Sequence, residues 1–469
     1  MNGFIKKYVF IVALLVLGLS TRFLFISHPS DVVWDEQHFG TFTKGYFEKK
    51  YFFDIHPPLG KFLLFGALKI AGADPGDFDF KIGTPYPANY PYVAARFFSA
   101  FLGGILPFII YLFARALTLS KRSSFLVSAF VLLDNALFAE SHFALIDIFV
   151  PVFGFAGLIF FLKHRDTPSY SRRWWLFLAL AAVGGTSAAS VKWTGIGALV
   201  VMGIATLIEC VEQKAWKTLF ARFGILVSIS VIFYASLYWA HFKMLPNSGP
   251  GDAFMSERFK ASLRGTAESQ RGDVAPLDFF EKLTELNKKM FVVNAGQTLT
   301  HPDSSRFYEW PVGRKRIYFW TEKDGGARRI YLIANPVVWL FGLGSLAGII
   351  GLFIFRHRRI RELLMAQPEW RTRIYSLEFL LLVFFVNWLP FAAVTRAMFL
   401  YHYFTSLIAS LILGAFLFFE LIPALGAVKT ATTSGRRENQ YLYWILLALA
   451  TGAFVLFSPL SYGYRPFVL

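Results

Sequence analysis

The chain contains 469 residues, of which 55% are hydrophobic, 18% aromatic and only 16% charged. Soluble globular proteins have roughly a quarter of their residues charged, so this composition excludes an ordinary soluble domain and predicts a polytopic membrane protein. The formal net charge is +17 at pH 7, but the basic residues stand in short clusters between apolar runs, as a membrane topology signal would. We therefore expect contact with anionic membrane lipids and no binding to nucleic acid.

The first residues, MNGFIKKYVFIVALLVLGLSTRFLF, combine a basic start with an apolar run. A signal peptide begins in the same way, but this run is long and no small-residue cleavage site follows it. We predict a retained first helix.

Apolar windows of about 17 to 25 residues, the length that crosses the hydrocarbon layer, recur to the end of the chain. The third and fourth windows are interrupted by Asp134, Glu140 and Asp147. The windows predict an all-α fold with about eleven transmembrane helices, near residues 7–27, 94–117, 123–140, 143–162, 174–191, 193–210, 219–241, 331–355, 375–395, 397–420 and 441–459.

Six basic connections fall on one side of the membrane if the chain crosses it at each of these windows. They are Lys6 with Lys7, Lys121 with Arg122, residues 163–173, Lys214 with Lys217, residues 356–373, and Lys429 with Arg436 and Arg437. The positive-inside rule makes this side, and the N-terminus, cytoplasmic. Two long segments, 28–93 and 242–330, are then extracytoplasmic loops of a single membrane domain over residues 1–469.

Two adjacent carboxylates, Asp35 and Glu36, occur in the stretch WDEQHFG at the start of the first loop. They are either a solvated loop pair or part of a site. Further along, FDIHPPLGKFLLFGALKIAG (53–72) predicts a turn followed by a short amphipathic helix in the membrane interface. Such a helix holds His56 and Lys61 at headgroup depth, where they suit a lipid phosphate or serve only as a surface anchor.

Other motifs place polar residues near the same face. YPYVAARFFSAFLGG puts Arg96 at the outer mouth of the second helix, as a phosphate-binding fork or as a helix cap. VTRAMFLYHYFTSL puts Arg396 and His402 at the start of the tenth helix, for function or for close helix packing. HPDSSRFYEWPVGRKRIYFW suggests a folded lid or an acceptor-facing element, whose candidate residues are His301, Arg306, Tyr308, Glu309 and Trp310.

Ionisable groups beside membrane helices are costly, so a cluster of them on the outer side is a functional-site hypothesis; the alternative is that they pair and hold helices together. Glu140, His142, Asp147 and Lys192 join the residues named above on that side. The single cysteine, Cys210, excludes disulfides within the chain and a cysteine-based metal site. No other spacing predicts a metal site, and dependence on a divalent metal stays open.

WDEQHFG, FDIHPPLGK, the arginine of YVAARFFSA, HPDSSRFYEWP and FLYHYF occur in the order found in protein O-mannosyltransferases, which are membrane glycosyltransferases of the GT-C class. The resemblance spans nearly the whole chain. Eukaryotic members carry a MIR domain in the loop before the eighth helix, whereas the loop 242–330 is too short for one. The resemblance therefore implies a bacterial-type enzyme of the plasma membrane.

The resemblance implies inverting transfer of mannose from a polyprenyl-phosphate carrier to Ser or Thr hydroxyls of translocated proteins, with no cofactor beyond this lipid-linked donor. In that reading Asp35 is the general base and Glu36 orients the acceptor or the donor. Arg96 matches a functionally important arginine of the family, and the candidates to bind the donor phosphate are Arg96, Lys61, His56, Arg396 and His402.

Two alternatives stay open. One is another GT-C transferase, moving a different lipid-phosphate-linked sugar to a lipid or glycan. The other is a secondary transporter, although inverted repeats and a matched pair of broken helices are not evident. The polyprenol carrier, the acceptor proteins and the oligomeric state are not predicted by the sequence.

Overall fold

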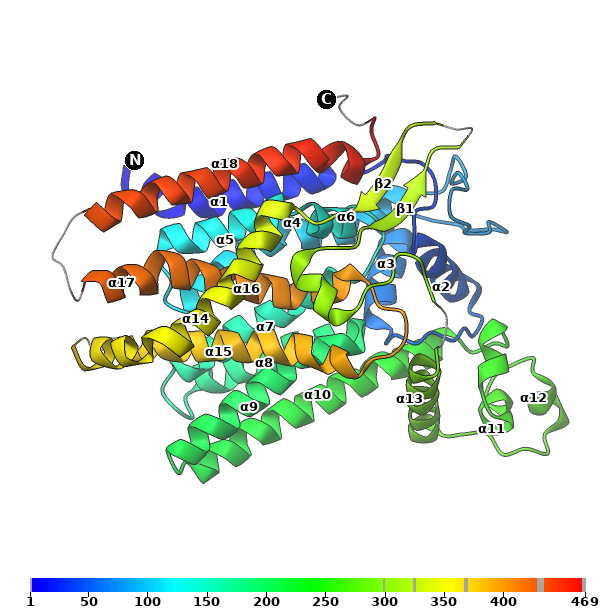
Figure 1. Ribbon diagram of the computed structural model, residues 1–469. Coiled ribbons are helices and arrows are strands. Elements are labelled where there is room, and N and C mark those ends of the chain that lie inside the picture. Colours follow the sequence, from blue (N-terminus) through cyan, green and yellow to red (C-terminus); the bar gives the residue numbers. More distant parts are fainter. Residues whose placement is uncertain (1, 298–299, 324–325, 367–369, 428–433, 466–469) are drawn as a thin grey trace.

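The computed structural model describes residues 2–297, 300–323, 326–366, 370–427 and 434–465. Most of the helices, long and short, lie side by side in a bundle (Figure 1). They are α1 (Asn2–Phe23), α4 (Tyr92–Ala116), α5 (Lys121–Leu133), α6 (Asn135–His142), α7 (Phe149–Arg165), α8 (Arg172–Val191), α9 (Gly197–Glu212), α10 (Trp216–Met244), α14 (Pro336–Ala366), α15 (Trp370–Trp388), α16 (Phe404–Phe416), α17 (Ile422–Ala427) and α18 (Ser434–Tyr462).

Shorter elements gather at one end of the bundle, which we call the loop end (Figure 1). The segment between α1 and α4 contributes two helices there, and the segment between α10 and α14 contributes helices and a hairpin. These elements are α2 (Glu36–Glu48), α3 (Leu59–Ile70), α11 (Glu257–Ala261), α12 (Ala267–Arg271), α13 (Phe279–Ala295), the 3-10 turn η3 (Phe307–Val312), β1 (Ile317–Thr321) and β2 (Arg329–Leu332). The connection between α9 and α10 lies at the opposite end.

The predicted helical membrane fold is confirmed, and a helix lies at each of the predicted windows. Within the described residues, 7 helices are long and apolar enough to cross a membrane, or 8 if α5 and α6 form one broken span. The count of eleven crossings stays a prediction. Of the predicted basic connections, Lys429 and part of 356–373 lie outside the described residues.

The third predicted window is not one straight helix, because Asp134 breaks it. α5 and α6 meet there at a bend of 57°. The Asp134 carboxylate accepts a hydrogen bond from the backbone N–H of Leu137 (2.9 Å) and another from the indole of Trp339 (2.7 Å). An aspartate that caps a new helix in this way redirects the chain. The next helix starts only at Phe149, so Asp147 lies in the turn before it.

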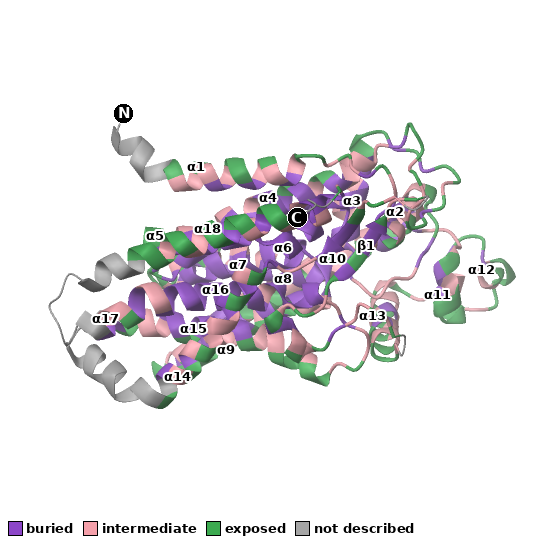
Figure 2. Ribbon diagram, turned by 45° about the horizontal axis from the view of Figure 1, so that its top comes forward, coloured by how far each residue is buried: buried purple, intermediate pink, exposed green. Residues whose placement is uncertain are grey.

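Helices in the bundle approach closely where glycines face one another. A Cβ atom added to Gly184 of α8 would lie 2.6 Å from the Cα of Gly157 in α7, and one added to Gly18 of α1 would lie 2.1 Å from the carbonyl oxygen of Gly104 in α4. Small residues that allow such contact are a common basis of helix packing in membranes. Buried side chains accordingly fill the middle of the bundle, whereas α11 and α12 are largely exposed (Figure 2).

A two-stranded hairpin, which the sequence analysis did not predict, joins the two long loops. β1 pairs with β2 in an antiparallel register. The backbone N–H of Trp34 donates to the carbonyl of Phe319 (3.2 Å), and the indole of Trp320 donates to the Asp31 carboxylate (3.0 Å). The hairpin therefore fixes the first loop against the second, next to Asp35.

Candidate active site

Asp35 lies at the loop end, where the chain enters α2. The preceding residue, Trp34, has φ of 44°, an uncommon left-handed geometry for a bulky side chain. Asp35 follows as the N-cap residue of α2 without using its side chain to cap the helix. Its carboxylate is partly exposed and has no hydrogen-bond or ion-pair partner in the described part of the chain.

The surroundings of Asp35 make its carboxylate more basic than usual. Although part of the side chain is exposed, its burial among neighbouring residues removes hydration and raises the pKa of Asp35 from 3.8 to about 6. His38 and Lys192 lower the pKa by their positive charges, and Asp147 raises it. A carboxylate with this pKa is ionised at neutral pH and can accept a proton from an attacking alcohol.

Glu36, the next residue, is fully buried, and both oxygens of its carboxylate accept several hydrogen bonds. Arg96 holds it at two points, with Nε 2.8 Å from one oxygen and Nη2 2.9 Å from the other. The backbone N–H groups of Val33 and Ala144 also donate to it, each at 2.9 Å, and the Tyr86 hydroxyl does so at 3.2 Å. Glu36 thus fixes the entrance to α2 and does not face the site as a second base.

Arg96 also has no unused donor. Its Nη1 donates to the carbonyls of Ile26 (3.1 Å) and Pro29 (2.8 Å), and its Nη2 donates to that of Asp31 (3.1 Å) as well as to Glu36. Arg96 is buried against α4 and holds the first loop in place. Its predicted role in binding the donor phosphate stays a prediction, and this geometry offers a phosphate no free edge of the guanidinium.

Lys61 resembles Arg96 in having its donors occupied by the protein. Its Nζ lies 2.5 Å from the Asp54 carboxylate and donates to the carbonyls of His56 (2.8 Å) and Pro57 (3.0 Å). Lys61 is buried, because α3 starts directly after Pro58 and turns this side chain toward the preceding loop. Lys61 is therefore not a free surface cation but shapes the loop that carries His56, and its predicted role in binding the donor phosphate stays a prediction.

Positive charge converges on His56 from several elements. Burial lowers the pKa of His56 well below its usual range, and the charges of Lys192, Lys61 and Arg396 lower it further. His56 is therefore neutral at physiological pH and remains a candidate hydrogen-bond partner, not a source of charge.

Lys192 and Asp147 form a second buried pair beside Asp35. The Nζ of Lys192 lies 2.7 Å from Asp147 Oδ1 and 4.8 Å from the centre of the Tyr401 ring. Lys192 ends α8 and Asp147 precedes α7, so their pairing is part of the contact between these helices. One oxygen of Glu140, which lies on α6, is buried without a hydrogen-bond partner among the described residues.

Arg396 is the predicted phosphate ligand whose guanidinium is least engaged. It is half-buried and donates from Nη1 to the carbonyl of Ala397 (3.1 Å). It lines a cavity of about 260 Å³ together with Arg306 and Lys315. His402 lies nearby on η5 (Leu400–Tyr403), with Nδ1 facing the Phe399 backbone and Nε2 buried with no hydrogen-bond partner in the part of the chain that the structure describes.

The predicted lid residues occupy three different environments. His301 packs against Trp34 with ring centres 5.4 Å apart, which brings it close to Asp35. Glu309 accepts a hydrogen bond from the backbone N–H of Arg306 (2.9 Å) at the start of η3. Tyr308 is 65% exposed, whereas Trp310 is fully buried and donates to Ser305 (3.0 Å). An acceptor can therefore reach Tyr308 but not Trp310 in this structure.

Sequence reasoning did not single out Asp54, Asp31 or Tyr401, although each borders the site. Asp54 lies within FDIHPPLGK, seven residues before the lysine it binds. Its place in the same motif as His56 and Lys61 was the signal that could have identified Asp54 as a site residue. Within the described residues, no group of three or more His, Cys, Asp and Glu is arranged to hold a metal ion.

Comparison with known families settles what this arrangement belongs to. A family model described as dolichyl-phosphate-mannose-protein mannosyltransferase matches residues 12–246, which is half of the chain. A second, described as the C-terminal four TMM region of protein-O-mannosyltransferase, matches residues 279–466. The chain belongs to the protein O-mannosyltransferase family. Membership confirms the resemblance drawn from the sequence motifs.

Relatives in this mannosyltransferase family are longer than the chain. Dolichyl-phosphate-mannose–protein mannosyltransferase 3 of Saccharomyces cerevisiae is 36% identical over 263 residues, covering 54% of this chain and 35% of that protein. Protein O-mannosyltransferase 1 of Drosophila melanogaster is 33% identical over 265 residues, covering 54% of this chain and 30% of that protein. The chain thus spans about a third of the length of the curated relatives that it matches.

Solved structures show that the mannosyltransferase fold extends over the whole chain. A chain of the Saccharomyces cerevisiae protein O-mannosyltransferase Pmt1–Pmt2 complex bound to the sugar donor has a TM-score of 0.85 at 20% identity, covering 98% of this chain and 90% of that one. ArnT from Cupriavidus metallidurans bound to undecaprenyl phosphate has a TM-score of 0.53 at 12% identity, and the match covers 97% of this chain and 77% of that one. The predicted GT-C fold is therefore confirmed.

Proposed function

We propose that the chain transfers mannose, with inversion, from a polyprenyl-phosphate-linked donor to Ser or Thr hydroxyls of proteins. The observation that carries the proposal is the unpartnered Asp35 carboxylate, with a pKa of about 6, fixed at the loop end beside the buried pair of Glu36 and Arg96. The names of the relatives, which are protein mannosyltransferases, support the same activity.

In the proposed reaction the acceptor hydroxyl oxygen attacks the anomeric carbon of mannose from the face opposite the phosphate. Asp35 takes the hydroxyl proton as the new C–O bond forms. The bond between the anomeric carbon and the phosphate oxygen breaks, and polyprenyl phosphate leaves as an anion. No covalent sugar intermediate forms, so one displacement inverts the anomeric centre.

The departing phosphate needs positive charge close to its developing anion. Arg96 and Lys61 already have their donors engaged, as described above. In the described part of the chain Arg396 retains most of its guanidinium donors, and the charges of Arg396 and Lys192 both act on His56. We therefore assign the donor phosphate to the neighbourhood of Arg396, with His56 as a neutral hydrogen-bond partner.

The acceptor is proposed to approach along the segment from His301 to Glu309, because His301 touches Trp34 and Tyr308 is exposed. We further propose that the loop end is extracytoplasmic, that the N-terminus is cytoplasmic and that the protein resides in a bacterial plasma membrane, where acceptors are met during translocation. The basic connections at the other end of the bundle support this orientation.

A defined transfer assay tests the proposal. The full chain in lipid vesicles would receive synthetic mannosyl phosphoryl polyprenol and a peptide containing Ser and Thr, with and without EDTA. We expect mannosylated peptide by mass spectrometry and an inverted anomeric configuration by NMR, and the arm with EDTA measures whether transfer depends on a divalent metal. Transfer from a different sugar donor, or to a lipid but not to the peptide, would instead establish another GT-C transferase.

A further inference from the structure

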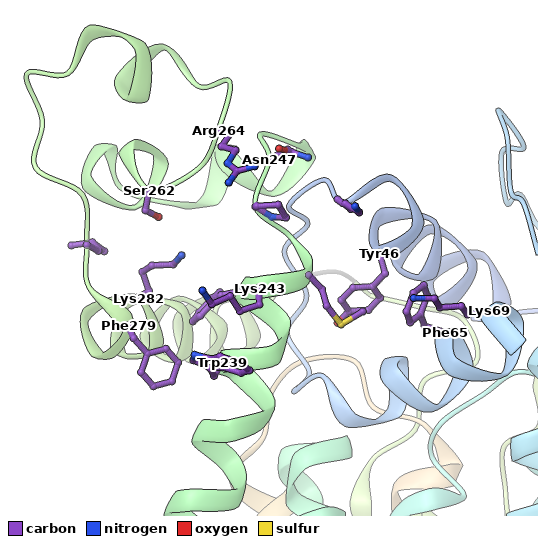
Figure 3. Close-up of a pocket in the computed structure, with 15 residues that line it drawn as sticks. Tyr46, Phe65, Lys69, Trp239, Lys243, Asn247, Ser262, Arg264, Phe279 and Lys282 are labelled. Carbon is purple, nitrogen blue, oxygen red and sulfur yellow. The ribbon is translucent and has the colours of Figure 1, made fainter.

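A large basic pocket lies at the loop end, between α2 and α3 on one side and the end of α10 with the α11–α13 segment on the other (Figure 3). Its volume is about 970 Å³. Tyr46 and Phe65 form one wall, and Trp239 and Phe279 lie across from them. The mechanism proposed above uses none of these residues.

Five cations line this pocket without a neutralising carboxylate. They are Lys49, Lys69, Lys243, Arg264 and Lys282. No Asp or Glu is among the lining residues, and in the described chain none of the five side chains forms an ion pair or a hydrogen bond. Burial, and then the charge of Lys243, lowers the pKa of Lys282. Lys282 is half-buried and the other four cations are exposed, so water screens part of their repulsion, and an anion in the pocket would relieve the rest.

Aromatic rings hold three of these cations in place. Lys282 lies 4.6 Å from the centre of the Phe242 ring, Lys69 lies 5.7 Å from Phe65, and Lys243 lies 5.8 Å from Trp239. Contact with a ring face positions an ammonium group without consuming its N–H donors. The donors therefore remain available to an anionic ligand.

The pocket lies at the end of α10, a helix with a broad exposed apolar face. Only 11% of the most apolar window of α10 is buried inside the protein, and Val231 and Ile232 on this helix are 61% and 68% exposed. These side chains face lipid. Trp239, near the end of the same helix, is 55% exposed, as is typical of tryptophans at headgroup level. Ile70 at the end of α3 is 89% exposed and flanks the same region.

We propose that this pocket binds the phosphate-bearing headgroup of an anionic bilayer phospholipid, whose acyl chains lie along the exposed face of α10. The charge of the pocket selects an anion, its size accommodates a headgroup, and its position at the end of a lipid-facing helix selects a membrane lipid over a soluble ligand. A bound lipid would link α2 and α3 to α13, because each side supplies cations. This site is separate from Asp35 and does not depend on the proposed transfer reaction.

Retention of a spin-labelled lipid by the reconstituted full chain tests the proposal directly. The double variant Lys243→Gln with Lys282→Gln removes two central charges of the pocket. The matched control, Lys288→Gln with Lys289→Gln, removes two lysines of α13 that do not line it. We expect wild type and control to prefer labelled phosphatidylglycerol over phosphatidylcholine, and we expect the pocket variant to lose about tenfold or more of this preference.

Three competitors identify the source of the anion. Unlabelled phosphatidylglycerol should displace the label, whereas polyprenyl phosphate and an acidic peptide should not do so at equal concentration. Equal lipid preference in wild type and pocket variant would overturn the proposal, and so would displacement by polyprenyl phosphate or by the peptide alone. If the double variant is not monodisperse in detergent, Lys69→Gln and Arg264→Gln replace it, each with a smaller expected loss.

Discussion

Arg96 donates two hydrogen bonds to the buried carboxylate of Glu36, from Nε at 2.8 Å and from Nη2 at 2.9 Å. The neighbouring Asp35 carboxylate has no partner in the described chain. Two adjacent acids thus have opposite situations. Glu36 is immobilised and neutralised, which fixes the backbone that presents Asp35, and Asp35 keeps its oxygens available for a proton.

Replacing Asp35 by asparagine should abolish transfer. The amide keeps the shape of the side chain but cannot accept the hydroxyl proton, so we expect the rate constant to fall about 100-fold to 10,000-fold. Turnover with saturating donor and peptide measures it. Asp79→Asn, which removes an exposed carboxylate of the same loop, should retain full activity. Near wild-type turnover of a folded Asp35→Asn protein would remove Asp35 from the role of base.

Transfer should also depend on pH in a way that reports the raised pKa of Asp35. The base must be ionised, so activity is present above pH 6 and is lost as the pH falls through about 6. In the acidic limb kcat/KM should fall by about tenfold per pH unit. An aspartate at its usual pKa of 3.8 would keep full activity at pH 5. A flat profile down to that pH would contradict the assignment.

Arg96 should prove to be a positioning residue that stabilises the fold. Arg96→Ala leaves Glu36 as an unpaired buried charge, which we expect to cost about 3–5 kcal/mol of unfolding free energy. Thermal unfolding in detergent would detect this loss, and Arg96→Lys should be intermediate because it lacks the planar fork. Arg258→Ala, which breaks an exposed pair with Glu281, serves as the control.

The outcome also decides the phosphate role that the sequence suggested for Arg96. If Arg96 instead binds the donor phosphate, the Arg96→Lys protein should have the same unfolding temperature as wild type. Only its apparent KM for the donor should be higher. That result would contradict the positioning role.

Arg396 should carry the phosphate interaction. Arg396→Gln removes a donor set from the developing anion, and we expect kcat to fall by about 100-fold to 1,000-fold, with a higher apparent KM for the donor. Arg396→Lys should recover part of the loss. Arg314→Gln, at a side chain that is 73% exposed, should change neither constant. If Arg396→Gln and wild type have equal kcat and KM, Arg396 does not bind the donor phosphate, and Lys192 or His402 becomes the candidate.

The orientation in the membrane is tested by labelling single cysteines in a Cys210→Ser background. Gln270→Cys, on the exposed α12 at the loop end, should react with an impermeant thiol reagent added to intact cells. Lys217→Cys, at the start of α10 at the opposite end, should react only after the membrane is opened. The reverse pattern would place Asp35 in the cytoplasm and invert the proposed topology.

Local signals allowed the sequence to predict the helices and the main acid. Apolar windows depend on composition, and the turn before α3 is marked by Pro57 and Pro58. Asp134 also indicated an interruption of its window, but the 57° bend and the hydrogen bond from Trp339, far along the chain, could not be predicted from it.

The partners of buried charges were not predictable in the same way. The sequence presents Arg96 as a free cation near a headgroup, and only the fold brings Glu36 against it from 60 residues away. The hairpin of β1 and β2 was missed because its strands have 5 and 4 residues, too few to show a clear alternation.

The hydrogen bond from Trp320 to Asp31 has a consequence for the order of biosynthesis. Asp35 leaves the ribosome early, but the hairpin that secures its loop is made only after most of the chain, and Arg396 later still. During insertion the nascent N-terminal half therefore carries the base with Glu36, Arg96 and Lys192, but without the hairpin and without Arg396. In the proposed reaction the site is complete only after the last third of the chain has entered the bilayer, so partly made chains would lack the residue that we assign to the donor phosphate.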